Sequence, residues 1–452
     1  MLFRQMYDTL ESWKEQDKKK ALCIIGARQI GKTTIVREFA KNNYKKFIEL
    51  NFLSDESLSE IFSNDLNADS IITKITAYTR MALEPGNTLI LLDEIQECPN
   101  ARTAIKFLVE DGRFDYIETG SMLGVRYKEV KSYPVGFEEV VYMYPMNFYE
   151  FAVANGVQTS TFDILEDCYK NNKEVDNIID GYMKKLFYLF CVVGGMPEVV
   201  QTYIDTKDIG KVINLQLQIS ELYRLDMSKY AVGNDKTKIK EIYDSIPSQL
   251  NNKNRRFFLS KIDKNGRQNR YENSFNWLAD AGIAIPVYNV CEPQAPLALN
   301  EKRNLFKLFM GDTGLLSAKS LDSIQFNLLQ GDVSINNGSI LENLFAQELK
   351  TNGFILYYYD SKKHGELDFV VQNNSGVDLI EVKSGNDYKN HNALDNVSEV
   401  DEWLFNKKVI FCKGNVEVDG EYLYLPWYMI MFYKRKKVQE MIYDISDNLY
   451  SP

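Results

Sequence analysis

The sequence predicts an α/β protein in which two α/β units are joined by a central helical region. Over residues 21–150, short apolar stretches alternate with segments whose apolar residues recur at helical spacing. This alternation is typical of a parallel sheet with helices on both faces. Residues 160–230 are helical in pattern almost throughout, and a second alternation of strand and helix begins at Ile340.

The elements of the first unit follow from this pattern. Residues 1–20 are predicted to form a helix that ends in a basic turn of three lysines. The expected strands are 22–25, 46–51, 88–92 and 115–119. Their carboxyl ends should meet at one edge of the sheet, where ligands bind in open α/β folds.

The composition excludes several classes of protein. With 45% apolar residues, the 452-residue chain has the composition of roughly two to four globular domains. The six cysteines form no C-x-x-C pair and are expected to be reduced thiols in a cytoplasmic protein. Only two histidines occur, which argues against a histidine-rich zinc site and a Ser-His-Asp hydrolase. No apolar run approaches the roughly eighteen residues of a membrane span, so no membrane partner is expected.

The stretch from Gly26 to Thr33 fits the pattern G-x-x-x-x-G-K-[ST]. It follows an apolar strand and opens a helical pattern, so its backbone N–H groups can form a phosphate cradle at a helix N-terminus. Lys32 would reach the β- and γ-phosphates of a nucleotide, and the Thr33 hydroxyl would bind Mg²⁺. The alternative is an ordinary glycine turn. The residues predicted to hold the nucleotide are Gly26, Ala27, Arg28, Gln29, Ile30, Gly31, Lys32, Thr33, Thr34, Asp93 and Ser121.

Asp93 and Glu94 end the apolar strand in "NTLILLDEIQE". Asp93 is predicted to join Thr33 in the magnesium shell, and Glu94 is predicted to polarise the attacking water as the catalytic base. The alternative is a solvated strand end. A third strand, in "FDYIETGSMLG", ends at Thr119 and Ser121, which could contact the γ-phosphate or the water, or could form a simple turn. Candidates for a catalytic arginine are Arg102, Arg113 and Arg126, while the side chain of Arg28, inside the phosphate loop, could face solvent or a neighbouring subunit.

A second chemical centre is predicted near the C-terminus, in "HGELDFVVQNNSGVDLIEVKSG". Strand residues two apart share a face, so Glu381 and Lys383 project together beside Asp368 on the neighbouring strand. The pattern resembles the PD-(D/E)xK nucleases, Holliday-junction resolvases among them. The resemblance implies a restriction-endonuclease-like α/β fold in which Glu342, Asp368 and Glu381 bind Mg²⁺ and Lys383 activates water. The alternatives are alternating charges on a half-exposed strand, and a nuclease-like domain that has lost its activity.

The central region carries the strongest local concentration of positive charge. Residues 236–316 predict short helices followed by two strands, "AGIAIPVYNV" and "LFKLFMGDTGLL", the order found in winged-helix domains. Although the formal charge of the chain is −10, this basic patch could contact DNA. A solvated helical surface is the alternative, and the basic run from Tyr433 to Met441 is expected to be a charged terminal helix. The basic residues of the patch are Lys253, Arg255, Arg256, Lys261, Lys264, Arg267 and Arg270.

The motifs "GARQIGKTT", "LLDEIQ" and "TGS" resemble those of AAA-superfamily ATPases with an uncharacterised C-terminal region. The stretches "PMNFYEF", "GGMPEVV", "LADAGIAIPV" and "FKLFMGDTGLL" are similar to later markers of the same family. One departure is Gly136-Phe137, where the family tends to carry Gly-Arg. The resemblance implies a P-loop NTPase fold and an ATPase that uses ATP and Mg²⁺.

These observations predict four regions: an ATPase domain over 1–150, a helical connection over 151–235, a winged-helix-like domain over 236–330 and a nuclease-like domain over 331–452. The expected function is ATP binding and hydrolysis coupled to DNA binding or processing, through residues 251–270 and the C-terminal domain. The alternative is an ATP-dependent switch whose C-terminal half is an inactive protein-interaction module. Oligomerisation is compatible with either function.

Overall fold

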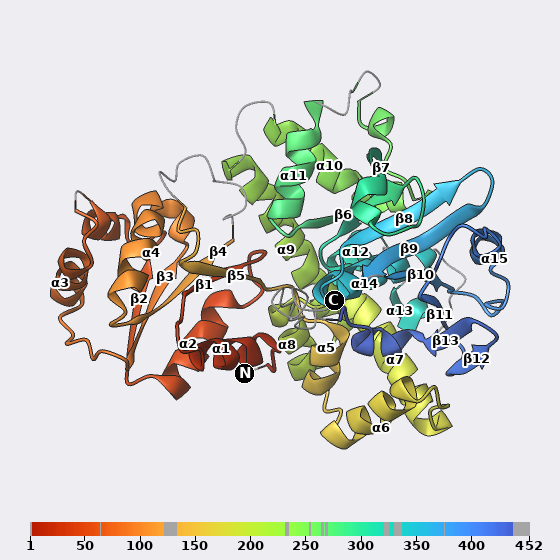
Figure 1. Ribbon diagram of the computed structural model, residues 1–452, viewed down its shortest axis with the longest axis horizontal. Helices are drawn as coiled ribbons and strands as arrows, with labels where there is room; N and C mark the ends of the chain where they lie inside the picture. Colours follow the sequence, from red (N-terminus) through yellow and green to blue (C-terminus); the bar gives the residue numbers. More distant parts are fainter. Residues whose placement is uncertain are drawn as a thin grey trace, which may run out of the picture.

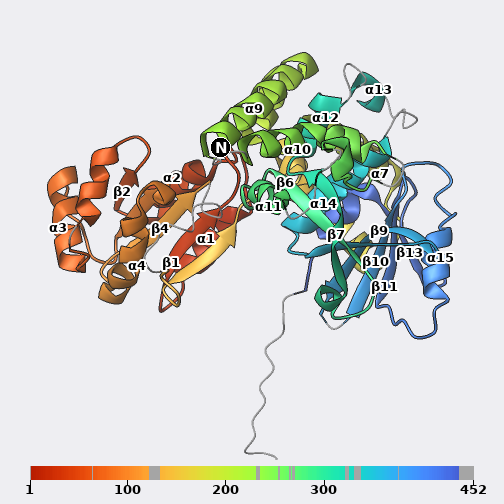
Figure 2. The same cartoon turned by 90° about the horizontal axis from the view of Figure 1, so that it is seen from above.

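The fold is seen in a computed structural model of the chain, in which two β-sheets lie at either end of a helical region (Figures 1 and 2). The structure describes residues 2–63, 65–121, 133–230, 235–252, 255–263, 266, 270–320, 325–329, 337–374 and 376–436. The N-terminal sheet and its helices are red to orange in Figure 1, and the C-terminal sheet is green to blue.

The N-terminal sheet has five parallel strands in the order β2-β3-β4-β1-β5. The four predicted strands are confirmed, and the sequence pattern missed the fifth, an edge strand that carries two adjacent glutamates and is only partly buried. Because β4 lies between β1 and β3, the end of β4 stands between the Gly-rich loop and Asp93. The strands are β1 (Ala21–Ile25), β2 (Lys46–Asn51), β3 (Thr88–Asp93), β4 (Asp115–Gly120) and β5 (Glu138–Tyr142).

Helices cover both faces of this sheet, as the sequence predicts. Leu22 and Ile24 point to one face and pack with α1 and α2, while Cys23 and Ile25 point to the other and pack with α3 and α4. The period of two along β1 therefore supplies both hydrophobic cores. The helices are α1 (Met6–Lys14), α2 (Lys32–Asn43), α3 (Ala68–Thr79) and α4 (Pro99–Asp111), with short 3₁₀ turns η1 (Glu56–Phe62) and η2 (Ile95–Glu97).

A helical region follows, and it packs against both sheets. The joint at Gly194-Gly195 is tight, because a Cβ on Gly195 would lie 2.0 Å from the carbonyl oxygen of Met146. The amide of Gly195 donates to the buried Asp312 carboxylate (2.7 Å), so the "GGMPEVV" stretch is a packing point between elements distant in sequence. The helices are α5 (Phe148–Ala154), α6 (Thr159–Lys170), α7 (Asn177–Val193), α8 (Pro197–Thr206), α9 (Ile209–Tyr230), α10 (Asp235–Leu250), α11 (Glu272–Asp280), α12 (Thr313–Ser320) and α13 (Gln325–Leu329).

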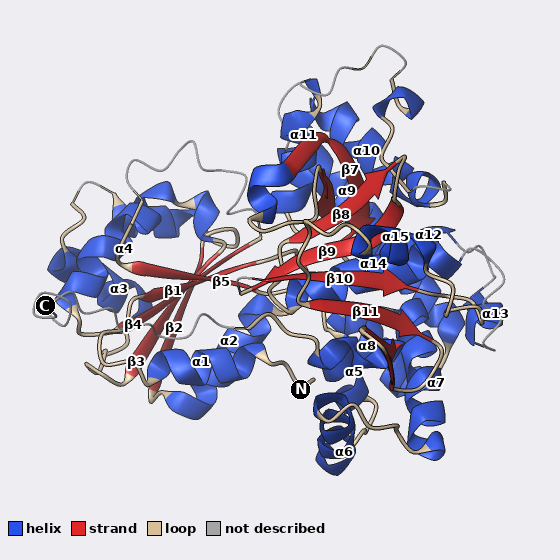
Figure 3. Cartoon of the chain, turned by 45° about the vertical axis from the view of Figure 1, so that its right-hand side comes forward, coloured by secondary structure: helices blue, strands red, loops and turns tan. Residues whose placement is uncertain are grey.

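The C-terminal sheet is mixed and has eight strands in the order β12-β13-β11-β10-β9-β8-β6-β7 (Figure 3). The alternation after Ile340 predicts strands near 354–359, 366–372, 377–383 and 408–412, and these four are confirmed, whereas β12 and β13 were not predicted. The strands are β6 (Ala284–Val290), β7 (Glu301–Met310), β8 (Leu356–Ser361), β9 (Gly365–Asn373), β10 (Gly376–Val382), β11 (Lys407–Cys412), β12 (Glu417–Asp419) and β13 (Tyr422–Pro426). The accompanying elements are α14 (Asn337–Thr351), α15 (Asn392–Ser398), η4 (Leu259–Lys261), η6 (Leu297–Asn300) and η7 (Trp427–Phe432).

The two strands predicted as a wing belong to this same sheet. β6 pairs with β7 antiparallel and with β8 parallel, so the hairpin extends the C-terminal sheet instead of standing apart as a separate wing. The second predicted strand also ends early, at Met310, because "DTGLL" continues into α12. The expected boundary at residue 330, between the winged-helix-like and nuclease-like domains, therefore does not separate two sheets. Strands that precede it and strands that follow it belong to one sheet.

Among the helices of the described residues, none combines the length and apolarity needed to cross a membrane.

Candidate functional site

The Gly-rich loop joins β1 to α2 at the carboxyl edge of the N-terminal sheet. Gly31, which precedes the helix, has φ 90°, in the left-handed region that favours glycine. A Cβ on Gly26 would lie 2.1 Å from the carbonyl oxygen of Met143, so the chain after β5 fixes the start of the loop. The loop thus presents backbone N–H groups at the N-terminus of a twelve-residue helix, as an anion site requires.

Lys32 is buried beneath this loop. Its ammonium donates to the carbonyl oxygens of Gly26 (3.0 Å) and Ala27 (2.8 Å). Burial lowers the pKa of Lys32 to about 8, although the nearby carboxylates of Glu94 and Asp93 act to raise it. A bound phosphate group would supply a negative charge that stabilises this buried ammonium in its protonated form.

Asp93 is held among three polar side chains. Thr33 Oγ1 donates to Asp93 Oδ1 (3.0 Å), Thr119 donates to the same oxygen, and Asn51 Nδ2 donates to Oδ2 (2.6 Å). The Thr33 hydroxyl and the Asp93 carboxylate therefore lie side by side, a pair of oxygens that fits Mg²⁺. Asn51 was not predicted as a site residue, although its position at the carboxyl end of β2 could have indicated that it lies near Asp93.

Glu94 follows β3 directly and has φ 54°, an uncommon backbone conformation for a residue other than glycine. Its Oε2 accepts hydrogen bonds from Ser121 Oγ (3.2 Å) and from Gln96 Nε2 (2.5 Å). Glu94 lines a cavity of about 440 Å³ together with the loop and the first turn of α2. The structure thus brings Lys32, Thr33, Asp93, Glu94 and Ser121 to one place, as the sequence analysis predicted.

Helix α9 closes the opposite side of this cavity. Leu222, Tyr223, Leu225 and Asp226 line it. The Tyr223 hydroxyl donates to the carbonyl oxygen of Arg28 (2.7 Å). The sequence pattern predicted α9 as a helix but not its position, because Arg28 and Tyr223 are 195 residues apart.

The Arg28 guanidinium connects α9 to the edge of the sheet. Its NH1 pairs with Asp226 Oδ2 (2.7 Å), and its Nε donates to Ser121 Oγ (3.2 Å). Because Ser121 in turn donates to Glu94, a chain of polar contacts leads from α9 to the predicted catalytic base.

The candidate arginines are engaged in ion pairs where the structure describes them. Arg102 is buried and pairs with Glu138 (2.7 Å) and Glu118 (3.9 Å). Burial and the charge of Glu138 raise the pKa of Glu118 to about 8. Arg113 pairs with Asp111 and Asp69 at the surface. Arg126 lies outside the described residues.

The predicted residues of the second centre also come together, on α14, β9 and β10. The Lys383 ammonium pairs with Glu381 Oε1 (2.8 Å), and the amide of Val382 donates to Asp368 Oδ2 (2.8 Å). Glu342 reaches the same cluster from α14, and the charge of Asp368 contributes to raising its pKa. Burial and the charge of Asp368 raise the pKa of Glu381 to about 7.

Two cations enter this carboxylate cluster from the central region. Arg255 pairs with Glu342 and lies 3.9 Å from Asp368, and the fully buried Lys307 pairs with Glu366 (2.6 Å) and Glu342 (3.5 Å). Burial raises the pKa of Glu342 well above its usual value, against the charges of Lys307 and Arg255. The sequence analysis missed both cations as site residues.

The carboxylates of this cluster are paired with cations in this arrangement. Among the described residues, the one group of three His, Cys, Asp or Glu side chains with ligand atoms within 4.8 Å of one another is Cys23, Glu118 and Glu138, which surround Arg102. At the second centre, Arg255 and Lys307 supply the positive charge that a metal would bring. The metal role of Glu342, Asp368 and Glu381 stays a prediction.

The basic patch over residues 251–270 is partly turned inward. Arg255 faces the carboxylate cluster, and Arg256 pairs with Asp360 on β8. Lys261 donates to Asn252, and Arg270 is exposed. Lys253, Lys264 and Arg267 lie outside the described residues, as does the basic run after Lys436. Arg255 and Arg256 are therefore engaged in ion pairs within the chain, and DNA contact through residues 251–270 stays a prediction.

Comparison with known protein families finds a match for the N-terminal part of the chain. Residues 18–152 match the family AAA_14, described as an AAA domain. The Gly-rich loop, Asp93 and Glu94 all lie within the matched residues, and the match supports ATP binding there. Two further families match, DUF8612 over residues 184–324 and DUF4143 over residues 337–430, and both are described as domains of unknown function. No curated protein matches the chain.

Several solved structures are similar to this chain. A Walker-type ATPase of Pyrococcus abyssi has a TM-score of 0.41 and 13% identity, and the match covers 71% of this chain and 96% of that chain. Aeropyrum pernix ORC1, in complex with DNA, has a TM-score of 0.27 and 14% identity over 72% of this chain and 92% of that chain. Thermotoga maritima RuvB has a TM-score of 0.29 and 12% identity over 63% and 89%. Because these TM-scores are all below 0.5, no conclusion about the function of this chain is drawn from these similarities.

Proposed function

We propose that the protein binds Mg-ATP in the cavity between the Gly-rich loop and α9 and hydrolyses it. The observation that carries this proposal is the convergence of Lys32, Thr33, Asp93 and Glu94 at one edge of the parallel sheet. A buried ammonium, a hydroxyl beside a carboxylate and a second carboxylate are the groups that phosphoryl transfer to water requires.

Each side chain has a separate part in this proposal. Lys32 leaves the carbonyl oxygens of the loop and pairs with the phosphate oxygens, and Thr33 and Asp93 hold the magnesium ion directly or through water. The ion neutralises the charge that develops on the phosphates. Glu94 accepts a hydrogen bond from the attacking water and orients it, while Ser121 positions Glu94. Asn51 and Thr119 keep the Asp93 carboxylate in place.

The contacts of Arg28 support a coupling between nucleotide and helix α9. Arg28 belongs to the phosphate loop, yet its guanidinium pairs with Asp226 on α9. A γ-phosphate would compete with Asp226 for this guanidinium, since both are anionic. We propose that nucleotide binding loosens the Arg28–Asp226 pair and moves α9, which packs on α8, α10 and α12.

The direct test is phosphate release from Mg-ATP by the full chain. We expect turnover by the native protein, and loss of turnover in Lys32→Ala because the phosphates lose their buried cation. Lys45→Ala is the matched control, since Lys45 is an exposed lysine of the same domain whose ion pair with Glu84 is long (3.7 Å). Turnover that survives in Lys32→Ala would overturn the proposal.

We expect the affinity for Mg-ATP to fall as the pH rises above about 8. In the free protein, Lys32 loses its proton near this pH because burial lowers its pKa. Bound phosphate would raise that pKa, so the complex holds more protons than the free protein, and lower pH favours binding. Calorimetric titrations at pH 7 and pH 9, each in two buffers of different ionisation enthalpy, measure the affinity and the proton uptake. Equal affinities without proton uptake would contradict the prediction.

We propose for the C-terminal domain a binding role without nucleic acid cleavage. The observation that favours this role is the pairing of Arg255 and Lys307 with Glu342, Asp368 and Glu366. These internal ion pairs hold the carboxylates that a nuclease would use for its metal, and a divalent ion would have to displace both cations.

This role predicts that branched and linear DNA stay intact when incubated with the protein, ATP and Mg²⁺ or Mn²⁺. Gel electrophoresis of labelled DNA measures cleavage, and Lys383→Ala and Arg255→Ala serve as matched variants. Cleavage by the native protein that Lys383→Ala abolishes would contradict the proposal and support a nuclease. Cleavage gained only in Arg255→Ala would show instead that Arg255 blocks an otherwise competent site.

A further inference from the structure

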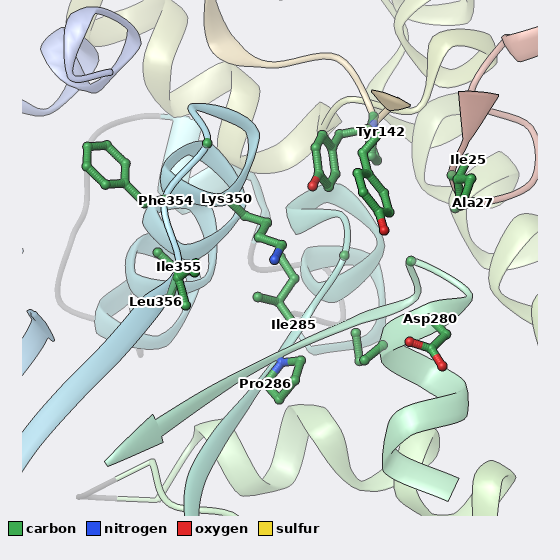
Figure 4. Close-up of a pocket in the computed structure, with 18 of the residues that line it drawn as sticks. Ile25, Ala27, Tyr142, Asp280, Ile285, Pro286, Lys350, Phe354, Ile355 and Leu356 are labelled. Atoms are coloured by element: carbon green, nitrogen blue, oxygen red, sulfur yellow. The ribbon is translucent and has the colours of Figure 1, made fainter. Parts of the chain in front are cut away.

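A second cavity, of about 580 Å³, lies between the N-terminal domain and the C-terminal sheet. Three segments line it: the chain from Ile25 to Ala27 with the residues after β5, the turn from α11 into β6, and the end of α14 leading into β8. Figure 4 shows Tyr142, Lys350 and Asp280 around this space, one from each side. The volume is in the range of small-molecule sites, and Lys32, Thr33 and Glu94 line the nucleotide cavity and not this one.

The walls of this interdomain cavity are mostly apolar and aromatic. Ile285, Pro286 and Phe354 contribute apolar surface, and four tyrosines line the space. Aromatic side chains present flat faces on which a planar ring can stack, and their hydroxyls can serve as hydrogen-bond donors. The tyrosines are Tyr142, Tyr144, Tyr288 and Tyr357.

Lys350 is the cation of the interdomain cavity. It is half-buried at the end of α14 and, among the residues that the structure describes, it has neither a hydrogen bond nor an ion pair through its ammonium. Burial lowers its pKa, and no neighbouring charge contributes. A partly desolvated ammonium without a counter-ion favours an anionic group close to it.

Asp280 and Glu301 limit how much negative charge the cavity accepts. Asp280 is exposed at the end of α11. Glu301 is the first residue of β7, at the opposite end of the β6–β7 hairpin from Asp280. Both carboxylates repel polyanions such as nucleoside triphosphates, while a single anionic group can pair with Lys350.

We propose that this interdomain cavity is a binding site for a small aromatic molecule with one anionic group, which pairs with Lys350 and stacks on the tyrosines. The probe is 1-anilinonaphthalene-8-sulfonate, an aromatic monoanion whose fluorescence rises in apolar sites. Titration of the full-length protein is expected to give one saturable site. Lys350→Met should weaken binding about tenfold or more, whereas Lys350→Arg, which keeps the charge, should retain it.

Two controls make the result specific. Lys185→Met removes an exposed lysine on α7 and should leave binding unchanged. Leu225→Glu should also retain the site, because Leu225 is exposed and lines the nucleotide cavity, not the interdomain cavity. Ile355→Glu tests the same site without a buried substitution: Ile355 is 57% exposed and lines the cavity, so a carboxylate there should repel the probe.

The proposal is overturned if probe binding is the same in Lys350→Met and Ile355→Glu as in the native protein, or if Leu225→Glu abolishes it. Thermal melts followed by circular dichroism show whether each variant is folded. If Lys350→Met does not fold, the Ile355→Glu titration alone decides between the two outcomes.

Discussion

Replacing Glu94 by glutamine is expected to slow ATP hydrolysis about 100-fold or more while Mg-ATP still binds. The carboxylate lies in the nucleotide cavity beside Lys32 and Thr33, and it already accepts hydrogen bonds from Ser121 and Gln96. Glutamine keeps the shape and the ability to accept from Ser121, but its amide cannot take the proton of the attacking water. The loss should therefore fall on kcat and leave the affinity nearly unchanged.

Steady-state turnover and a separate binding titration measure these two quantities. Glu110→Gln, an exposed glutamate on α4, is the matched control and should behave as the native protein. A Glu94→Gln variant with native turnover would show that another group activates the water. A variant that no longer binds Mg-ATP would show that Glu94 shapes the site and is not its base.

Replacing Lys307 by methionine is expected to lower the free energy of unfolding by about 3–5 kcal/mol, the usual cost of removing one partner of a buried ion pair. Lys307 is fully buried on β7 and pairs with Glu366 and Glu342. Burial alone would lower its pKa, but the charges of these carboxylates raise it, so Lys307 stays protonated. Methionine fills a similar volume but leaves the carboxylates without this charge.

Urea denaturation at neutral pH, followed by circular dichroism, measures the change. Lys302→Met on the same strand is the control, because the ammonium of Lys302 has no ion pair among the described residues. Adding Glu342→Gln to Lys307→Met should recover part of the stability, since one uncompensated charge is then removed. A loss below about 1 kcal/mol in Lys307→Met would mean that water or a relaxed side chain satisfies the carboxylates.

The nucleotide site could be predicted because its chemistry is local in sequence. Lys32 and Thr33 follow the loop directly, and Asp93 and Glu94 follow a strand, so a parallel sheet was enough to bring them together. The contribution of α9 could not be predicted in this way. Tyr223 and Asp226 contact Arg28 because the helical region packs against the first domain. The periodicity of α9 indicates which face of the helix is buried, but it does not indicate which part of the chain covers that face.

The C-terminal carboxylate cluster could be predicted only in part, because its chemistry is not local in sequence. Residues Asp368, Glu381 and Lys383 were predicted from their spacing, but the cations that pair with the cluster come from distant segments. Lys307 did leave a signal, because a single lysine inside the apolar run "LFKLFM" indicates a buried charge with a partner. Arg255 left no such signal: its neighbours are polar and basic, so its pattern is that of an exposed surface.

Calorimetric titration of the full chain with Mg-ATP at pH 7 tests the central claim most directly. The proposed nucleotide site predicts one binding site per chain in the native protein and none in Lys32→Ala, with both proteins folded by circular dichroism. Absence of any binding heat in the folded native protein, at several temperatures, would contradict the claim that the Gly-rich loop and Lys32 hold a nucleoside triphosphate.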